Sequence, residues 1–500
     1  MLGIGNSYSA VDLPPSLVSS EMSAAIDRWK GLYYNNAPWL DRNSLSLGLP
    51  ADIANRVSTM ITLEAKISVT DMDGDEADDE VGDAELNPRA KLINEAMESS
   101  RDNLRLNVEY ACALGGLMFK PYIDASVKKI SVDYIKADSF YPTKVSADGK
   151  IIGAVFFERK TIKDKSYIRV EEHDYNPATR SCVIKNRAFE SFNQANTFGA
   201  EIPLNAVADW AHLQPETPIS DLDSPLFSYF KIPQGNIIDI ESDLGVSVYA
   251  RADLDGLLKE ADKQFQRLMW EYEGGELAID ASSDAFKKGK DGELEIPANK
   301  ERLYRINDLD LLSANAKEGL FSTFAPELRD SSYSKGLNDV LIKVENVCSL
   351  ARGSLADVSE QARTATEMRL MRQQTYQLVT STQGALENAL NDTVAAIDAL
   401  ADLYGLTPKG EFHVSYVWDD SILTDSESER QRDLQEVREG LMAKWEFRKK
   451  WYGESKAKAQ RMIAEQQAGA MTPDELMGFQ KTSPKKNSEE EPPKKEDGKE

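Results

Sequence analysis

The N-terminal part of the chain carries apolar residues at helical spacing. Between residues 21 and 34 they recur at three- and four-residue steps, and Pro38 stops the pattern. A second stretch of the same kind covers residues 50–65, and a short strand is expected from Lys66 to Thr70. Residues 71–85 are acidic and almost devoid of large apolar side chains. The pattern therefore predicts two amphipathic helices and a strand, followed by an exposed loop.

Apolar and polar positions alternate between about residues 106 and 215. The turn-forming residues Gly, Asp, Asn and Pro separate the alternating stretches. Asp148-Gly149 is a candidate tight turn, because glycine accepts the positive φ that such turns need. The region is expected to be α+β and built on hairpins. The strands expected in it are Leu117–Ile123, Lys129–Ile135, Ile151–Arg159 and Tyr167–Tyr175.

Helical spacing returns from residue 252 to residue 273. Its apolar stripe begins at Leu254, and the pattern ends at Gly274-Gly275. Short apolar pieces around a polar tip follow, which predicts a compact insert with β-structure over residues 274–312. Helical spacing then resumes over residues 316–350.

The longest uninterrupted helical pattern covers residues 363–404. A helix of about 42 residues, at ~1.5 Å per residue, would span roughly 60 Å. Gly353 and small polar residues separate it from the preceding helix, which they are expected to end. Residues 412–418 then alternate like a strand, and residues 425–468 form a highly charged helical region.

Composition points to a folded protein with an acidic surface. Of the 500 residues, 41% are hydrophobic and 29% are charged, which is too apolar for general disorder. The net charge of −25 disfavours a protein that grips DNA by neutralising its phosphates. Only the tail, residues 469–500, is expected to be disordered, because it lacks large apolar side chains towards its end.

The cysteines and the N-terminus favour a reducing cytoplasm. Three cysteines stand far apart without any C-x-x-C spacing, so neither a disulfide framework nor a zinc site is indicated. The first residues resemble no signal peptide, and no run of 18 apolar residues occurs. The chain is interpreted as neither secreted nor membrane-spanning.

Candidate catalytic and metal-binding motifs are weak. Asp71, Asp73 and Asp75 do not fit a calcium loop, because the glycine comes at the fourth position. The three histidines are widely separated, and the sequence has neither a phosphate-binding G-x-x-x-x-G-K-[ST] loop nor a G-x-S-x-G elbow. Asp419-Asp420 after a strand could hold a nuclease metal, although such a pair more often forms a turn or a helix cap. The sequence thus indicates a protein that is not an enzyme and has no cofactor.

Two long helices bracket a small β insert, and a loop then leads to a helix of unusual length. A monomer built in this way would leave its apolar stripes poorly covered, which suggests that identical subunits pack side by side. A closed ring is one natural solution.

Eight short segments carry a further signal and together cover roughly residues 26 to 465. They are Arg28-Trp29-Lys30, Ala37-Pro38-Trp39-Leu40, Tyr110 to Tyr122, Asp138 to Pro142, Pro225-Leu226-Phe227, Leu244 to Val248, Arg363 to Glu367 and Trp418 to Ile422. In their sequence and order these segments resemble the portal proteins of tailed phages, in particular those of long-tailed phages of Gram-positive bacteria.

The resemblance implies an elongated α+β subunit of a twelve-fold ring. Its regions would be an α/β wing with a very long spine helix, a helical stem, a small clip with β-structure, a tunnel loop and a helical crown. On this chain they are the wing 1–252, stem helix 253–273, clip 274–312, second stem helix 313–350, tunnel loop 351–362, spine helix and strand 363–424, crown 425–468 and tail 469–500.

The resemblance also implies a role in the virion. The ring would stand at one capsid vertex, assembled in the host cytoplasm, and double-stranded DNA would be packaged and ejected through it. Its partners would be the terminase large subunit, the head–tail adaptor, and the major capsid and scaffolding proteins. The clip residues expected to dock partners are Lys287, Lys288 and Lys290.

The tunnel loop is expected to be a flexible bridge that touches the DNA. Its charges cancel, so phosphate contacts would be weak and independent of sequence. The residues expected to meet phosphates are Arg352, Ser354, Asp357, Ser359 and Gln361. A buried hinge needed only for folding is the alternative for this loop. For the whole protein, the alternatives are another head or connector protein, or a metal-dependent nuclease that uses Asp419 and Asp420.

Overall fold

The chain divides into two compact units. The main unit comprises residues 1–72 and 85–424, and the C-terminal unit comprises residues 73–84 and 425–500. The computed structural model describes residues 12–63, 65–70, 87–124, 129–162, 165–191, 198–281, 304–306, 321–357, 365–418, 426–452 and 456–469.

The N-terminal elements form where the apolar pattern predicts them. Helix α2 covers Ser20–Tyr33, and the side chain of Ser19 caps it by accepting a hydrogen bond from the backbone N–H of Met22. Helix α3 covers Leu49–Thr62, and strand β1 covers Lys66–Thr70. The apolar faces of both helices are buried in the core of the main unit.

Helix α4, Pro88–Leu114, was not anticipated from the sequence, which suggested that a hairpin region begins near residue 106. Polar residues at its centre interrupt the apolar stripe. The helix depends instead on its caps and on neighbours distant in sequence. Asn87 accepts hydrogen bonds from the N–H groups of Arg89 and Ala90, while the buried Arg89 forms salt bridges with Asp398 and Asp402.

Two antiparallel sheets follow α4, and all four predicted strands are confirmed. The smaller sheet has the strand order β10-β2-β3, and the larger has the order β4-β5-β6-β7-β8, with β9 also paired to β7. Gly149, at φ +81°, lies in the turn between β4 and β5, as the sequence predicts. The strands are β2 Gly116–Asp124, β3 Lys129–Lys136, β4 Phe140–Val145, β5 Ile151–Ile162, β6 Lys165–Asn176, β7 Ser181–Ser191, β8 Glu201–Ile202, β9 Glu216–Ile219 and β10 Ser228–Lys231, with short 3-10 helices η1 Leu204–Ala206 and η2 Ala208–Trp210.

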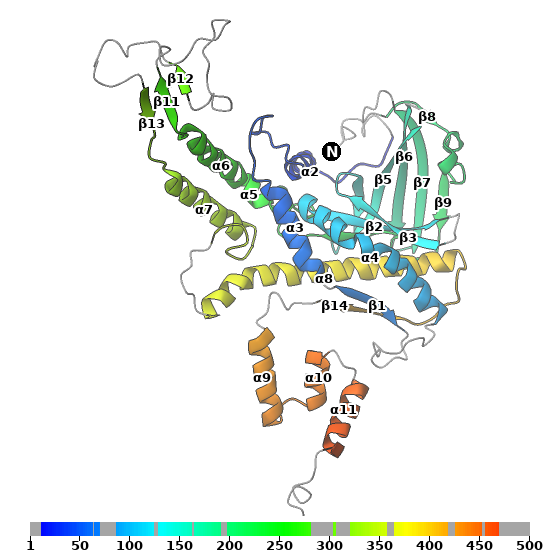
Figure 1. The fold of residues 1–500 in the computed structure, drawn as a ribbon. Coiled ribbons are helices and arrows are strands. Elements are labelled where there is room, and N and C mark those ends of the chain that lie inside the picture. Colours follow the sequence, from blue (N-terminus) through cyan, green and yellow to red (C-terminus); the bar gives the residue numbers. More distant parts are fainter. Residues whose placement is uncertain are drawn as a thin grey trace, which may run out of the picture. The chain divides into compact units, whose positions relative to one another are not determined.

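Helix α8, Ala365–Leu403, is the predicted long helix and has 39 residues. Figure 1 shows it running along α3, α4 and the smaller sheet. Hydrogen bonds fix α8 to the smaller sheet and to α3. Ser228 of β10 donates to the carbonyl of Ala389 in α8, and Gln383 of α8 donates to the carbonyl of Ile61 in α3. After α8, strand β14, His413–Val417, pairs with β1. This pairing joins the N-terminal and C-terminal segments of the main unit.

The helical hairpin after residue 250 differs from the sequence prediction in two ways. The first helix is broken into α5, Ala250–Leu254, and α6, Leu257–Gly274, because Gly256 adopts φ +72°. Leu254 is consequently 55% exposed and does not join the buried stripe. The second helix, α7, covers Asp330–Val347 and begins well after residue 316.

A small sheet occupies the tip of this hairpin. Strand β11, Ala278–Ala281, pairs in parallel with β12, Tyr304–Ile306, and antiparallel with β13, Phe321–Phe324. Residues 321–324 were expected to be helical, but β11 offers them backbone partners, and Pro326 disfavours helix in the residue before it. β-Structure in the insert is confirmed, and the insert reaches further than residue 312.

The C-terminal unit is helical, as its sequence predicts. It contains α9 Ser426–Glu439, α10 Lys444–Tyr452 and α11 Lys456–Gly469. Asp433 of α9 accepts hydrogen bonds from Lys450 and Trp451 of α10. Burial alone would raise the pKa of Asp433, but these hydrogen bonds outweigh it and hold the pKa below its ordinary value.

Two glycines meet where the sheets connect to the hairpin. Gly115 ends α4 at φ +94°, and a Cβ atom added to Gly245 would lie 2.0 Å from the carbonyl oxygen of Gly115. The N–H of Gly245 donates to the hydroxyl of Tyr229, and the N–H of Val248 donates to the carbonyl of Cys112. Only glycine permits this crossing of backbones.

We expect Gly245→Ala to lower the free energy of unfolding by about 3 kcal/mol, because the new methyl group must displace backbone atoms rather than a flexible side chain. Chemical denaturation followed by circular dichroism measures the effect. Gly235→Ala is the matched control, since a Cβ there meets nothing within 4 Å. Equal stability of the two variants would show that the close approach is not a constraint.

Candidate functional site

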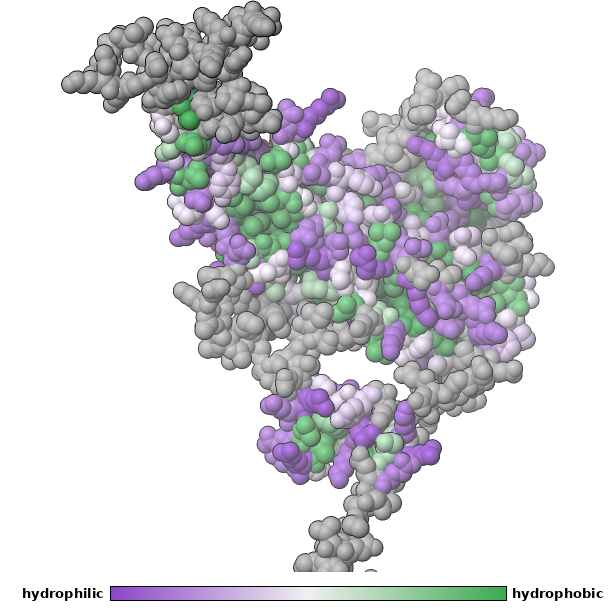
Figure 2. Space-filling model, viewed as in Figure 1, coloured by the Kyte–Doolittle hydropathy of each residue, from purple (hydrophilic) through white to green (hydrophobic). Residues whose placement is uncertain are grey.

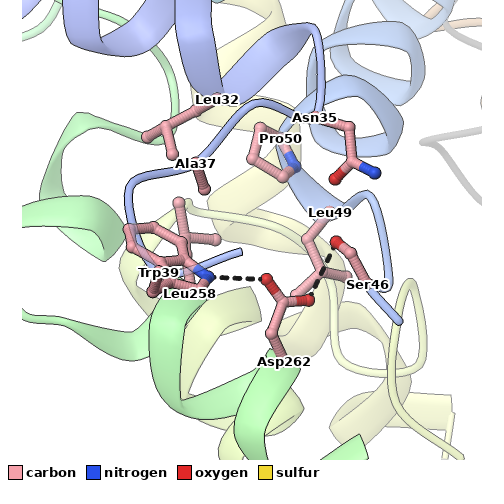
Figure 3. Close-up of a pocket in the computed structure, with 9 residues that line it drawn as sticks. All are labelled: Leu32, Asn35, Ala37, Trp39, Ser46, Leu49, Pro50, Leu258 and Asp262. Atoms are coloured by element: carbon pink, nitrogen blue, oxygen red, sulfur yellow. Dashed lines mark hydrogen bonds between the residues drawn. The ribbon is translucent and has the colours of Figure 1, made fainter. Parts of the chain in front are cut away.

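The segment after α2 is fixed to the helical hairpin by a buried carboxylate. Asp262 of α6 is 6% exposed and accepts hydrogen bonds from the indole Nε1 of Trp39 at 2.9 Å, the Oγ of Ser46 at 3.0 Å and the N–H of Leu47 at 2.9 Å. Figure 3 shows Trp39 and Ser46 approaching Asp262 from two sides. The space among these residues is about 10 Å³, which is room for one water molecule. The cluster is therefore a structural anchor.

A second anchor joins α2 to α5. Arg28 donates two hydrogen bonds of 2.6 Å to the carboxylate of Asp253, which is also buried. The guanidinium of Arg28 lies 5.9 Å from the centroid of the Trp39 ring, so both anchors share one aromatic side chain. Arg28 and Trp39, which belong to the motifs at residues 28–30 and 37–40, thus attach the hairpin to the rest of the main unit.

Helices α6 and α7 lie side by side (Figure 1) and are joined at their far end. Glu271 of α6 accepts hydrogen bonds from the Nε and Nη2 atoms of Arg329 at 3.1 and 2.8 Å, and from the N–H of Arg329 at 3.0 Å. The hydrogen bonds from Arg329 lower the pKa of Glu271, so the pair stays ionised at neutral pH.

The hairpin leaves large apolar side chains uncovered in the monomer. Figure 2 shows hydrophobic residues gathered over these helices. Trp270 is the most exposed of them, at 64%. Large apolar side chains left exposed along one hairpin favour a surface that another protein covers. These residues are Leu254, Trp270, Tyr272, Leu277 and Leu328.

The loop after α7 is held by Glu345, a fully buried residue near the end of that helix. Its Oε1 atom accepts hydrogen bonds from the N–H groups of Gly353 at 3.0 Å, Leu355 at 2.6 Å and Ala356 at 2.9 Å. A carboxylate near a helix C-terminus is disfavoured by the helix dipole, and three N–H donors offset that cost. Its Oε2 atom is buried and has no hydrogen-bond partner in the described part of the chain.

Two further features define the loop. Asn338 clamps Asp357 through two hydrogen bonds between its side-chain amide and the backbone of that residue, of 2.7 and 3.1 Å. Helix α7 ends before the loop, with Ser349 at φ +57° and the N–H of Leu350 bonded to the carbonyl of Glu345. The expectation that Gly353 ends the helix is therefore wrong, and Gly353 instead forms a turn inside the loop at φ +92°.

The residues predicted to touch DNA differ in their surroundings. Arg352 and Asp357 are exposed, whereas Ser354 is half-buried and its hydroxyl donates to the carbonyl of Ala351. Ser359 and Gln361 lie outside the described residues. Over residues 350–357 the backbone is bound by the buried Glu345 and by Asn338 of α7, whereas the flexibility of the bridge stays a prediction.

The remaining predicted site residues fall outside the part of the chain that the structure describes. Lys287, Lys288 and Lys290, and also Asp419 and Asp420, lie outside the described residues. Within the described ranges, no three His, Cys, Asp or Glu side chains group as metal ligands, and no helix is long and apolar enough to cross a membrane.

The three cysteines are free and buried. Burial raises the pKa of the Cys348 thiol to about 12, so this thiol stays protonated and unreactive.

Sequence reasoning missed the carboxylates that organise the hairpin. Asp262 and Glu345 each have apolar residues about one helical turn before and after them, Leu258 and Phe265 in one case and Leu341 and Cys348 in the other, which is a weak signal of a buried acid with a partner. No sequence signal identifies those partners, because Trp39 is 223 residues from Asp262 and the loop amides belong to the backbone.

A protein-family model described as "Phage portal protein, SPP1 Gp6-like" matches residues 35–471. The chain belongs to this family of phage portal proteins. The resemblance noted in the sequence is thereby confirmed at the level of the family. This portal protein is a structural protein of the virion.

No curated protein matches the portal protein significantly. Solved structures do match it, among them three at 9–11% sequence identity. The neck of an empty gene transfer agent (GTA) particle, with C6 symmetry, has a TM-score of 0.40 at 11% identity and covers 88% of this chain and 95% of its own. The virion of a native GTA particle has a TM-score of 0.40 at 11% identity, and the match covers 91% of this chain and 99% of that chain. The neck of the native particle with C12 symmetry has a TM-score of 0.36 at 9% identity, and the match covers 88% of this chain and 96% of that chain.

We expect Glu345→Ala to release the loop of the portal protein, because three backbone N–H groups lose one shared acceptor. Hydrogen bonds to a charged group contribute about 1.5–3 kcal/mol each. Hydrogen exchange at Gly353, Leu355 and Ala356 should therefore accelerate at least tenfold. Asp339→Ala, which removes an exposed carboxylate from the same helix, is the control and should leave these rates unchanged. Unaltered exchange in Glu345→Ala would contradict the proposed role of Glu345.

Proposed function

We propose that this chain is the repeating subunit of a closed ring through which double-stranded DNA is packaged into the capsid and later ejected. The observation that carries the proposal is the α6–α7 hairpin, which is rigidly attached at several points and yet leaves large apolar groups uncovered. Membership of the portal family supports the same conclusion.

Neighbouring copies would supply the missing cover. Apolar residues of α7 remain only half-buried by α6, among them Leu337, Val340 and Leu341. A contact between two different faces of identical subunits closes into a ring when the rotation between neighbours is a whole fraction of a full turn and involves no shift along the axis. On the assignment implied by the family resemblance, twelve subunits would form it, and α6 and α7 would be its stem.

The loop at residues 350–357 would face the DNA. Its two exposed charges, Arg352 and Asp357, are opposite in sign, and the whole chain is strongly acidic. Few phosphate counterions would be displaced as the duplex passes, so the resistance to sliding stays low. The clamp by Glu345 would keep the backbone of the loop at a constant position while side chains touch the phosphates.

Docking of partners would occur at the tip of the hairpin. The insert between β11 and β13 would be the clip, and Lys287, Lys288 and Lys290 would contact the terminase large subunit and later the head–tail adaptor. The major capsid and scaffolding proteins would contact the ring at the capsid vertex during assembly.

Ring formation can be tested with the exposed tryptophan of α6. We expect Trp270→Glu to prevent the ring and leave a folded monomer of 55.7 kDa, because it places a charge in an apolar contact. Ile162→Glu, which changes a residue that is 41% exposed at the end of β5, should leave the ring intact. Light scattering and negative-stain images of both variants report the result. A wild-type chain that stays monomeric at every concentration and salt tested would refute the ring.

The charge of the loop can be changed without breaking its clamp. Asp357→Lys keeps the backbone bonds to Asn338 and makes the exposed loop positive, so we expect rings to form but packaging to slow, with recovery at higher salt. Asp339→Lys introduces the same charge change outside the loop and serves as the control. Packaging rates equal to those of the wild type at every salt concentration would argue against contact between the loop and DNA.

A further inference from the structure

A separate cavity lies between the ends of α2 and α4 and the turn from β3 to β4. Its volume is about 230 Å³, which is just below the ~300 Å³ at which pockets for drug-sized ligands begin. It is lined mainly by aromatic and charged side chains, together with Ala113, Leu114 and Ser139. Those that matter here are Lys30, Tyr33, Tyr34, Tyr110, Lys136 and Asp138.

Lys136 is the cation of this cavity that lacks an acceptor. Its ammonium lies 3.7 Å from the centroid of the Tyr110 ring, and no described residue offers it a hydrogen-bond acceptor or a salt bridge. Lys30, the other lysine of the cavity, is paired with Asp138 at 2.5 Å. Burial lowers the pKa of Lys136, and the charge of Asp138 opposes this shift only in part. An ammonium in this position gains from a ligand that brings an oxygen acceptor.

The rest of the wall suits a flat apolar group. The ring of Tyr33 meets those of Tyr34 and Tyr110 edge to face, with centroid separations of 5.5 and 5.9 Å. The Tyr33 hydroxyl is already used, since it donates to Glu109 at 2.7 Å. Aromatic rings that meet edge to face can accept another ring in the same geometry.

We propose that this cavity binds an aromatic carboxylate, with its carboxylate on Lys136 and its ring against Tyr33 and Tyr34. A single negative charge matches a single unpaired ammonium, and the nearby Asp138 disfavours a doubly charged phosphate. The volume limits the ligand to about one ring. Two sources share this chemistry: a free small molecule, or the carboxyl-terminal aromatic residue of another protein.

Calorimetric titration of the full chain with benzoate tests the proposal. We expect a Kd on the order of 1 mM, as a ligand of this size allows, and binding at least tenfold weaker for benzamide, which lacks the charge, and for acetate, which lacks the ring. Lys136→Met should weaken benzoate binding at least tenfold, Lys136→Arg should preserve it, and Tyr34→Ala should weaken it. Lys129→Met, at the exposed start of the same strand, is the matched control.

The source is distinguished by a parallel titration with N-acetylphenylalanine. Tighter binding of that compound than of benzoate supports a chain terminus as the ligand, and the reverse supports a free small molecule. Absence of benzoate binding to the wild type, equal affinity for benzamide, or unchanged binding in a folded Lys136→Met chain would each overturn the proposal. Circular dichroism verifies that the variants are folded.

Discussion

The contact between the backbones of Gly115 and Gly245 is the constraint on which the arrangement of the main unit depends. It sets the end of α4 and the start of β2 directly against the segment that leads into α5 and α6. The N–H of Ile232 also donates to the carbonyl of Gly115, so three chain segments meet within hydrogen-bonding distance. Any side chain at this crossing would separate the sheets from the helical hairpin, and the hairpin would lose its fixed direction.

Buried carboxylates then hold the hairpin along its length. Asp253, Asp262, Glu271 and Glu345 are each less than 9% exposed, and each accepts hydrogen bonds from a segment outside its own helix. A buried carboxylate without such donors would be strongly destabilising, so each one fixes its partner firmly. These bonds fix the hairpin in addition to the apolar residues that it places in the core, such as Leu258 and Val344. Its exposed apolar groups remain free to contact a neighbouring subunit.

The loop after α7 combines order with exposure. Glu345 and Asn338 fix its backbone from within α7, while Arg352 and Asp357 extend into solvent. On the proposed function, an ordered backbone would keep the loop from collapsing onto a passing duplex, and exposed charges of opposite sign would keep each contact weak. Among the described residues the Oε2 atom of Glu345 has no hydrogen-bond partner. A buried oxygen without a partner there would offset part of the stabilisation that the three hydrogen bonds to Oε1 provide.

The sequence alone determined those elements whose signal lies in neighbouring residues. Helices α2, α3 and α8 and strands β2, β3, β5 and β6 follow from the spacing of apolar side chains, which depends only on local backbone geometry. The family resemblance, and with it the portal assignment, came from short motifs. The sequence also located the exposed loop charges Arg352 and Asp357.

Tertiary structure decided the rest, because the interactions involved join residues far apart in the chain. Helix α4 forms despite its polar centre, since Arg89 pairs with Asp398 and Asp402 more than 300 residues away. Residues 321–324 become a strand because β11 supplies backbone partners. The clamp on the loop depends on which backbone N–H groups the buried Glu345 reaches. Nearly every residue type has the same backbone N–H group, so the sequence does not indicate which ones these are. Local patterns specify what a segment can form, whereas its partners are chosen only when the chain has folded.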